Sequence, residues 1–217
     1  MLLAVLSLAA WFGGVVGYLV GPVPFLIALL LCVFGVYVGF TVLHESVHRV
    51  AHRNRRINDG IGRPFAWLLW FNYPVFRTCH LRHHANTNDA VNDPDHWVSH
   101  GTTLTRPFYL LTTPIRYWVL SRRHGWLTRR QLWAQTGSYL LGWAAAGSMA
   151  ISGNIGAVGI LFLPTIVAGL ILYYCLDYLP HCHSTALSDT SIHGFSQAGF
   201  VMPCCSVRTI TSYITFG

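Results

Sequence analysis

The sequence contains little charge, and it contains no lysine at all. Only 10% of its 217 residues are charged, whereas about a quarter of the residues are charged in a typical soluble domain. In their place, 53% of the residues are hydrophobic, and the mean hydropathy is +0.45. This composition excludes an ordinary soluble domain and indicates a protein that lies largely within a membrane.

Cysteine pairs with a recognisable spacing are missing too. The six cysteines show neither a CxxC motif nor the density of a disulfide-stabilised scaffold. Most of them lie in apolar stretches or on the side that the charge distribution assigns to the cytoplasm, so we expect them to be reduced.

The first apolar stretch lacks the basic flank of a signal peptide and leads through Gly21-Pro22 into a second apolar stretch. We therefore expect a membrane span rather than a cleaved signal. A helix needs roughly 20 apolar residues to cross a bilayer, and four stretches approach that length, at residues 2–20, 23–43, 132–151 and 155–179. The predicted fold is an all-α integral membrane protein with about four transmembrane helices, formed by one domain over residues 1–187.

The basic residues are concentrated in one connection. All 14 are arginines, and 13 of them lie between Arg49 and Arg130, after the second predicted span and before the third. Loops rich in basic residues stay in the cytoplasm, so we predict that residues 49–131 and both termini lie there. The net charge of +7 then reflects this topology and contact with anionic lipid headgroups, and gives no reason to expect a nucleic-acid partner. Two apolar segments of the connection, residues 64–76 and 105–120, are predicted to lie at the membrane interface because they are too short to span it.

Histidine is abundant, with 12 residues, and six of them form two clusters. The first cluster is spaced at i, i+4 and i+8, so its members share one face if the second span continues as a helix beyond the membrane. The second has the pattern HxxHH and also fits one helical face. A seventh histidine follows the fourth predicted span on the same side. The predicted metal ligands are His44, His48, His52, His80, His83, His84 and His181.

Seven imidazoles are more than a single tetrahedral zinc ion uses, so two metal ions explain them better. Nitrogen-rich coordination with open positions suits iron and oxygen chemistry. The histidines outside this set are interpreted as surface or headgroup contacts.

One pattern supports a function of another class. His44-Glu45-Ser46-Val47-His48 matches the HExxH motif of zinc proteases, in which Glu45 would be the general base. An intramembrane protease would need a third ligand, for which Asp177 is the candidate, and it would leave His80-Leu-Arg-His83-His84 without a role. The protease is therefore the alternative hypothesis.

Taken together, the clusters resemble the histidine boxes HxxxH, HxxHH and HxxHH of the membrane fatty acid desaturase/hydroxylase superfamily. Within that superfamily, the sequence most resembles the β-carotene hydroxylases of the cyanobacterial type. The stretches that carry the resemblance are His44-xxx-His48-Arg-Val-Ala-His52-Arg-Asn-Arg, Pro74-Val-Phe, His80-Leu-Arg-His83-His84-Ala-Asn, Asn92-Asp-Pro-Asp95-His96 and Asp177-Tyr-Leu-Pro-His181.

The resemblance implies two non-haem iron ions, held by His44, His48, His80, His83 and His84, with His52 and His181 as further candidates. It also implies O₂ as co-substrate, ferredoxin as electron donor and a lipid substrate that enters from the bilayer. The β-ionone ring of a carotenoid is the first choice, and a fatty acyl chain is the second.

Asp93 and Asp95 are predicted to orient ligand imidazoles as hydrogen-bond acceptors, a role that metal-bound histidines usually need filled. The alternative is that residues 92–95 form a solvated turn.

The resemblance fails at the third box, because no HxxHH pattern follows His183. With permitted codons, Met202–Gly217 reads ALLLGQNHHLIHHLW when each codon's third base is joined to the next two bases, and this string contains HxxHH. We therefore predict that residues 188–217 are a frameshifted tail and that the 217-residue chain has little or no activity. An inactive relic of an enzyme is the corresponding alternative.

Overall fold

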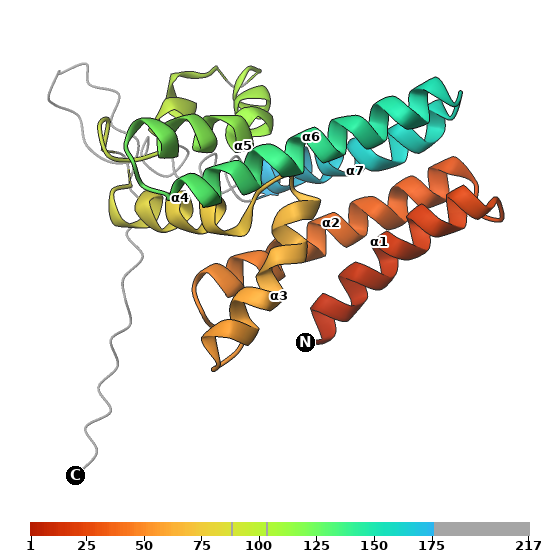
Figure 1. The fold of residues 1–217 in the computed structure, drawn as a ribbon, viewed down its shortest axis with the longest axis horizontal. Coiled ribbons are helices and arrows are strands. Elements are labelled where there is room, and N and C mark those ends of the chain that lie inside the picture. The colour runs from red at the N-terminus through yellow and green to blue at the C-terminus, as the bar shows by residue number, and fades with distance from the viewer. Residues whose placement is uncertain (88, 103, 176–217) are drawn as a thin grey trace, which may run out of the picture.

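The computed structural model describes residues 1–87, 89–102 and 104–175 (Figure 1). Every regular element in these residues is a helix, which confirms the predicted all-α class. The elements are α1 (Leu2–Val20), α2 (Phe25–Val47), α3 (Arg55–Leu68), α4 (Tyr73–Ala85), the short 3-10 helix η1 (His96–His100), α5 (Arg106–Arg123), α6 (Arg129–Ile151) and α7 (Ile155–Tyr173).

Within the described residues, α1, α2 and α7 are long and apolar enough to cross a membrane. The third predicted span, residues 132–151, corresponds to α6, which has the length but is more polar, with Arg129, Arg130 and Gln135 along it. The α1–α2 turn and the α6–α7 turn lie at the same end of the molecule, and α4 and α5 lie at the other (Figure 1). Helix α6 runs from the end that holds α5 to the end where α7 begins, so it covers the same length of the molecule as the three apolar helices (Figure 1).

Helices α1 and α2 form a hairpin in which small residues allow a close approach. Gly21 ends α1 in the left-handed conformation, with φ of 104°, and Pro24 precedes α2. Farther along, the Ser7 hydroxyl donates a hydrogen bond to the carbonyl oxygen of Gly35. A Cβ atom on Gly35 would lie only 2.8 Å from the Ser7 carbonyl oxygen. Small residues at such contacts are typical of helices that pack within membranes.

Replacing Gly35 with leucine is therefore expected to separate α1 from α2. The two nearest atoms in the way belong to the backbone of α1, and the third is the Trp11 Cβ atom, so none can move aside as the end of a side chain would. We expect a loss of about 1–3 kcal/mol in the free energy of unfolding, as for other overpacked contacts. The matched control is Gly13→Leu, because a Cβ atom on Gly13 meets nothing within 4 Å. Thermal unfolding of both variants in detergent measures the difference, and equal stability would contradict the close contact.

Helix α2 ends earlier than the sequence pattern suggested. Arg49 adopts a left-handed conformation with φ of 62°. Its N–H group donates to the Ser46 carbonyl (3.1 Å), and the N–H group of Val50 donates to the Glu45 carbonyl (3.0 Å). These two bonds form a Schellman motif, which terminates a helix. The expectation that the helix continues to His52 is therefore wrong, and His52 lies in the α2–α3 loop.

The apolar segment 64–76, expected at the membrane interface, is mostly part of the protein core. It forms the end of α3, a turn and the start of α4, and Phe65, Phe71 and Phe76 are all buried. The turn is held by Gln135 of α6, which donates to the Trp70 carbonyl (3.0 Å) and accepts from the N–H group of Asn72. Packing between helices explains the apolar character of this segment. The prediction from length and composition had attributed that character to contact with the membrane interface.

Candidate metal centre

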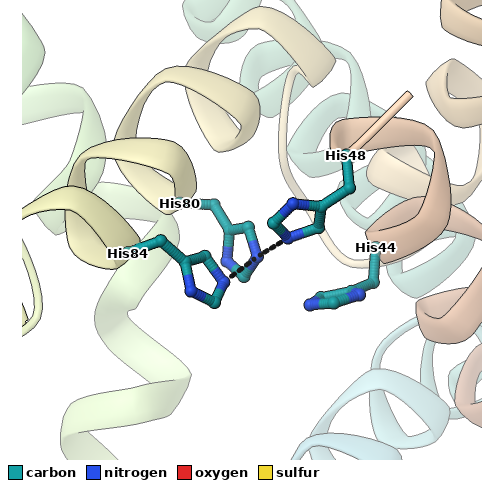
Figure 2. A group of neighbouring side chains, drawn as sticks. All are labelled: His44, His48, His80 and His84. Carbon is teal, nitrogen blue, oxygen red and sulfur yellow. Dashed lines mark hydrogen bonds between the residues drawn. The ribbon is translucent and has the colours of Figure 1, made fainter. Parts of the chain in front are cut away.

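Four of the predicted ligands come together where α2 ends beside α4. His44 lies in the last turn of α2, His48 follows at its C-cap, and His80 and His84 lie one turn apart on α4. One ring nitrogen of each lies within 4.8 Å of one from every other member. The four rings converge on a common space between the two helices (Figure 2). We call this group the four-histidine cluster.

The nitrogen–nitrogen distances fit coordination of one metal ion. His80 Nε2 lies 3.2 Å from His48 Nε2 and 3.0 Å from His84 Nε2. Imidazoles bound at about 2.1 Å and at right angles around an ion have nitrogens about 3.0 Å apart. One shared proton can form a hydrogen bond within one pair of nitrogens, but His80 Nε2 is in close contact with two nitrogens. The donor set thus suits a nitrogen-preferring metal such as iron.

The environment favours the neutral form of His80 and His84. Burial, and then repulsion from the neighbouring His84, His44, His48 and His83, lowers the pKa of His80 to about 3. Burial also lowers the pKa of His84, with His48 and His83 as further causes. The Phe76 ring stacks on His80 at a centroid distance of 5.2 Å and excludes water from one of its faces. Neutral imidazole is the form that binds metals, so these residues need not lose a proton first.

His83 lies next to the cluster but faces another group. Its Nδ1 atom is 2.8 Å from Asp93 Oδ1 and 3.5 Å from Asp95 Oδ2. The Tyr117 hydroxyl in turn donates to Asp95 Oδ2 (2.8 Å). A carboxylate on Nδ1 favours the tautomer that leaves Nε2 with a free electron pair for a metal. Asp93 and Asp95 thus contact a predicted ligand, and their role in orienting it stays a prediction.

The remaining predicted ligands are not part of this arrangement. His52 Nδ1 accepts a hydrogen bond from the N–H group of Asn54 (2.9 Å), which places the proton of the neutral ring on Nε2. His52 does not join the four-histidine cluster, and its role as a ligand stays a prediction. His181 and the tail at residues 188–217 lie outside the described residues.

Sequence patterns missed some residues around the site. Phe76 stands four residues before His80 on α4, and this i, i+4 spacing was a usable signal for their stacking. Ser46, Asn58 and Tyr73, which join the two histidine-bearing helices, gave no signal because their contacts depend on how three helices pack.

The model of the fatty acid desaturase family matches residues 21–217. The chain belongs to the fatty acid desaturase family. It is therefore an oxidoreductase of the membrane desaturase/hydroxylase type, and this family generally uses a di-iron centre. No curated protein matches the sequence.

Membership of the desaturase family also accounts for the HExxH pattern. In a zinc protease His80 and His84 would have no role, yet both contact the HExxH histidines here. The desaturase interpretation gives all four residues a role and therefore explains the pattern better than a protease does.

Proposed function

We propose that this desaturase-family protein uses O₂ and two electrons to hydroxylate an unactivated C–H bond of a membrane lipid, with the β-ionone ring of a carotenoid as the first-choice substrate. The observation that carries the proposal is the convergence of four imidazoles at the end of the apolar helix α2. The choice of a carotenoid as substrate rests on the resemblance to β-carotene hydroxylases, which is carried by residues 44–55, 74–76, 80–86, 92–96 and 177–181. Desaturation of a fatty acyl chain is the alternative, and family membership fits it equally well.

The chain's own residues hold and shape the proposed site. Bound iron would supply the oxidising power for the net change from C–H, O₂, two electrons and two protons to C–OH and water. His44, His48, His80 and His84 provide nitrogen donors, with His83, His52 and His181 as proposed further ligands to a pair of irons. Because α2 is an apolar span that ends at these residues, a lipid can reach the site without leaving the bilayer.

The electron donor is proposed to meet the site from the cytoplasm. Thirteen arginines lie between residues 49 and 130, the segment that contains α3, α4 and α5. The positive-inside rule supports a cytoplasmic position for the four-histidine cluster, where a soluble donor such as ferredoxin would be available.

Product analysis distinguishes the two substrates. We expect a version of the chain with its third histidine box restored to convert β-carotene into hydroxylated carotenoids in bacterial membranes supplied with ferredoxin and its reductase. Carotenoids and fatty acids from the same membranes are measured by chromatography and mass spectrometry. New double bonds in the acyl chains with unchanged β-carotene would favour the alternative. The absence of both products would contradict the proposal.

A further inference from the structure

The carbonyl oxygen of Ser46 is the meeting point of the helices that carry the four-histidine cluster. Ser46 is fully buried and lies between His44 and His48 in the sequence. Its carbonyl oxygen accepts a hydrogen bond from Asn58 Nδ2 of α3 (2.6 Å) and another from the hydroxyl of Tyr73 (2.9 Å). Tyr73 is the first residue of α4, the helix that presents His80 and His84. One backbone atom thus links three helices.

Both donor side chains are buried, so water does not compete for their hydrogen bonds. Asn58 is fully buried and Tyr73 is 4% exposed. Burial and the nearby Asp59 raise the pKa of Tyr73 to about 12, so its hydroxyl remains a donor at neutral pH. Asn58 also accepts, at Oδ1, a hydrogen bond from the N–H group of His52 (3.2 Å), which fixes the loop that follows α2. Each donor adds a buried hydrogen bond to this carbonyl, beside the one from the N–H group of Arg49, and so stabilises this arrangement.

The packing around this point leaves no room for adjustment. A Cβ atom on Gly62 of α3 would lie 2.3 Å from the Tyr73 ring and 2.8 Å from the Ser46 Cβ atom. Helix α3 therefore presses directly on both residues. A shift of α4 relative to α2 would break the Tyr73 hydrogen bond and change the separation of the histidine pairs that give the 3.2 Å contact between His48 and His80.

We propose that Asn58 and Tyr73 are positioning residues of the metal centre, which act through the Ser46 carbonyl to fix the histidine pair of α2 against the pair of α4. The inference rests on the proposed function in that it takes the four-histidine cluster as a metal site. Neither residue touches the metal; each sets where the ligands stand.

The test uses the full chain purified in detergent, with Co²⁺ as a spectroscopic probe. Tyr73→Phe keeps the ring and removes only the hydroxyl. We expect it to weaken Co²⁺ affinity by about tenfold, as loss of supporting hydrogen bonds around metal ligands does, and to shift the visible absorption bands of the bound ion. Thr165→Val is the matched control, because it removes a hydroxyl that donates to another backbone carbonyl, that of Leu68 (2.8 Å), and neither residue belongs to the four-histidine cluster.

A second readout is independent of the metal. In the metal-free protein, amide hydrogen exchange of residues 44–50 is expected to be faster in Tyr73→Phe than in the wild type, and unchanged in Thr165→Val. Wild-type affinity and spectrum in Tyr73→Phe would overturn the proposal, even if thermal stability fell. If the wild-type chain bound no Co²⁺, the proposed function would fail, and unchanged exchange at residues 44–50 would then overturn the positioning role separately.

Discussion

Replacing His80 with alanine is expected to lower iron affinity by more than about 100-fold, beyond what loss of a supporting residue costs. His80 is the central member of the four-histidine cluster, since its Nε2 atom lies 3.2 Å from that of His48 and 3.0 Å from that of His84. Its removal deletes one of the four donors, the one in close contact with two others. Iron titration of the purified chain, followed by metal analysis after dialysis, measures the effect.

The control for this substitution is His124→Ala. His124 stacks on Trp126 and is not a member of the four-histidine cluster, so the variant should retain iron as the wild type does. Circular dichroism of both variants checks that the helices persist. Equal iron binding by the His80 variant and the His124 variant would place the metal elsewhere.

Restoring the third histidine box is expected to raise hydroxylase activity by at least about 100-fold over the 217-residue chain, the scale on which metal sites depend on their surroundings. The restored version carries ALLLGQNHHLIHHLW in place of Met202–Gly217, and its HxxHH pattern would supply the ligands that the resemblance requires. The measurement is the rate at which β-carotene is hydroxylated by the two versions at equal expression.

Equal rates from the two versions would contradict the frameshift hypothesis. The nucleotide sequence provides an independent check, because the shifted frame must stay open and must encode histidines between Thr209 and Phe216. A stop codon in that frame, or other residues at those codons, would rule the hypothesis out. The family match extends through residue 217 and so includes this segment.

Long apolar stretches predicted the helices well, because burial in lipid depends on length and composition alone. The predicted spans at residues 2–20, 23–43 and 155–179 correspond to α1, α2 and α7. The end of α2 was not predictable, because Arg49 rather than glycine takes the left-handed position at its end. Segment 64–76 was assigned to the interface because local composition does not distinguish lipid from the apolar core of the protein.

Helical spacing predicted the pairs of histidines within the cluster. His44 with His48, and His80 with His84, stand four residues apart and share a face, as the structure confirms. Spacing did not separate His83, which turns to Asp93, from its neighbours. The hydrogen bonds that Ser46 accepts were beyond prediction, because they depend on the packing of α2, α3 and α4.

X-ray absorption at the iron edge, on the full chain purified from iron-supplied cells, would decide whether these histidines bind iron. We expect bound iron whose nearest neighbours include several nitrogens with the multiple-scattering pattern of imidazole, and we expect this pattern to weaken in the His80→Ala variant. Iron surrounded by oxygen alone, or a wild-type protein that retains no iron under conditions where its helices are intact, would contradict a metal centre at the ends of α2 and α4.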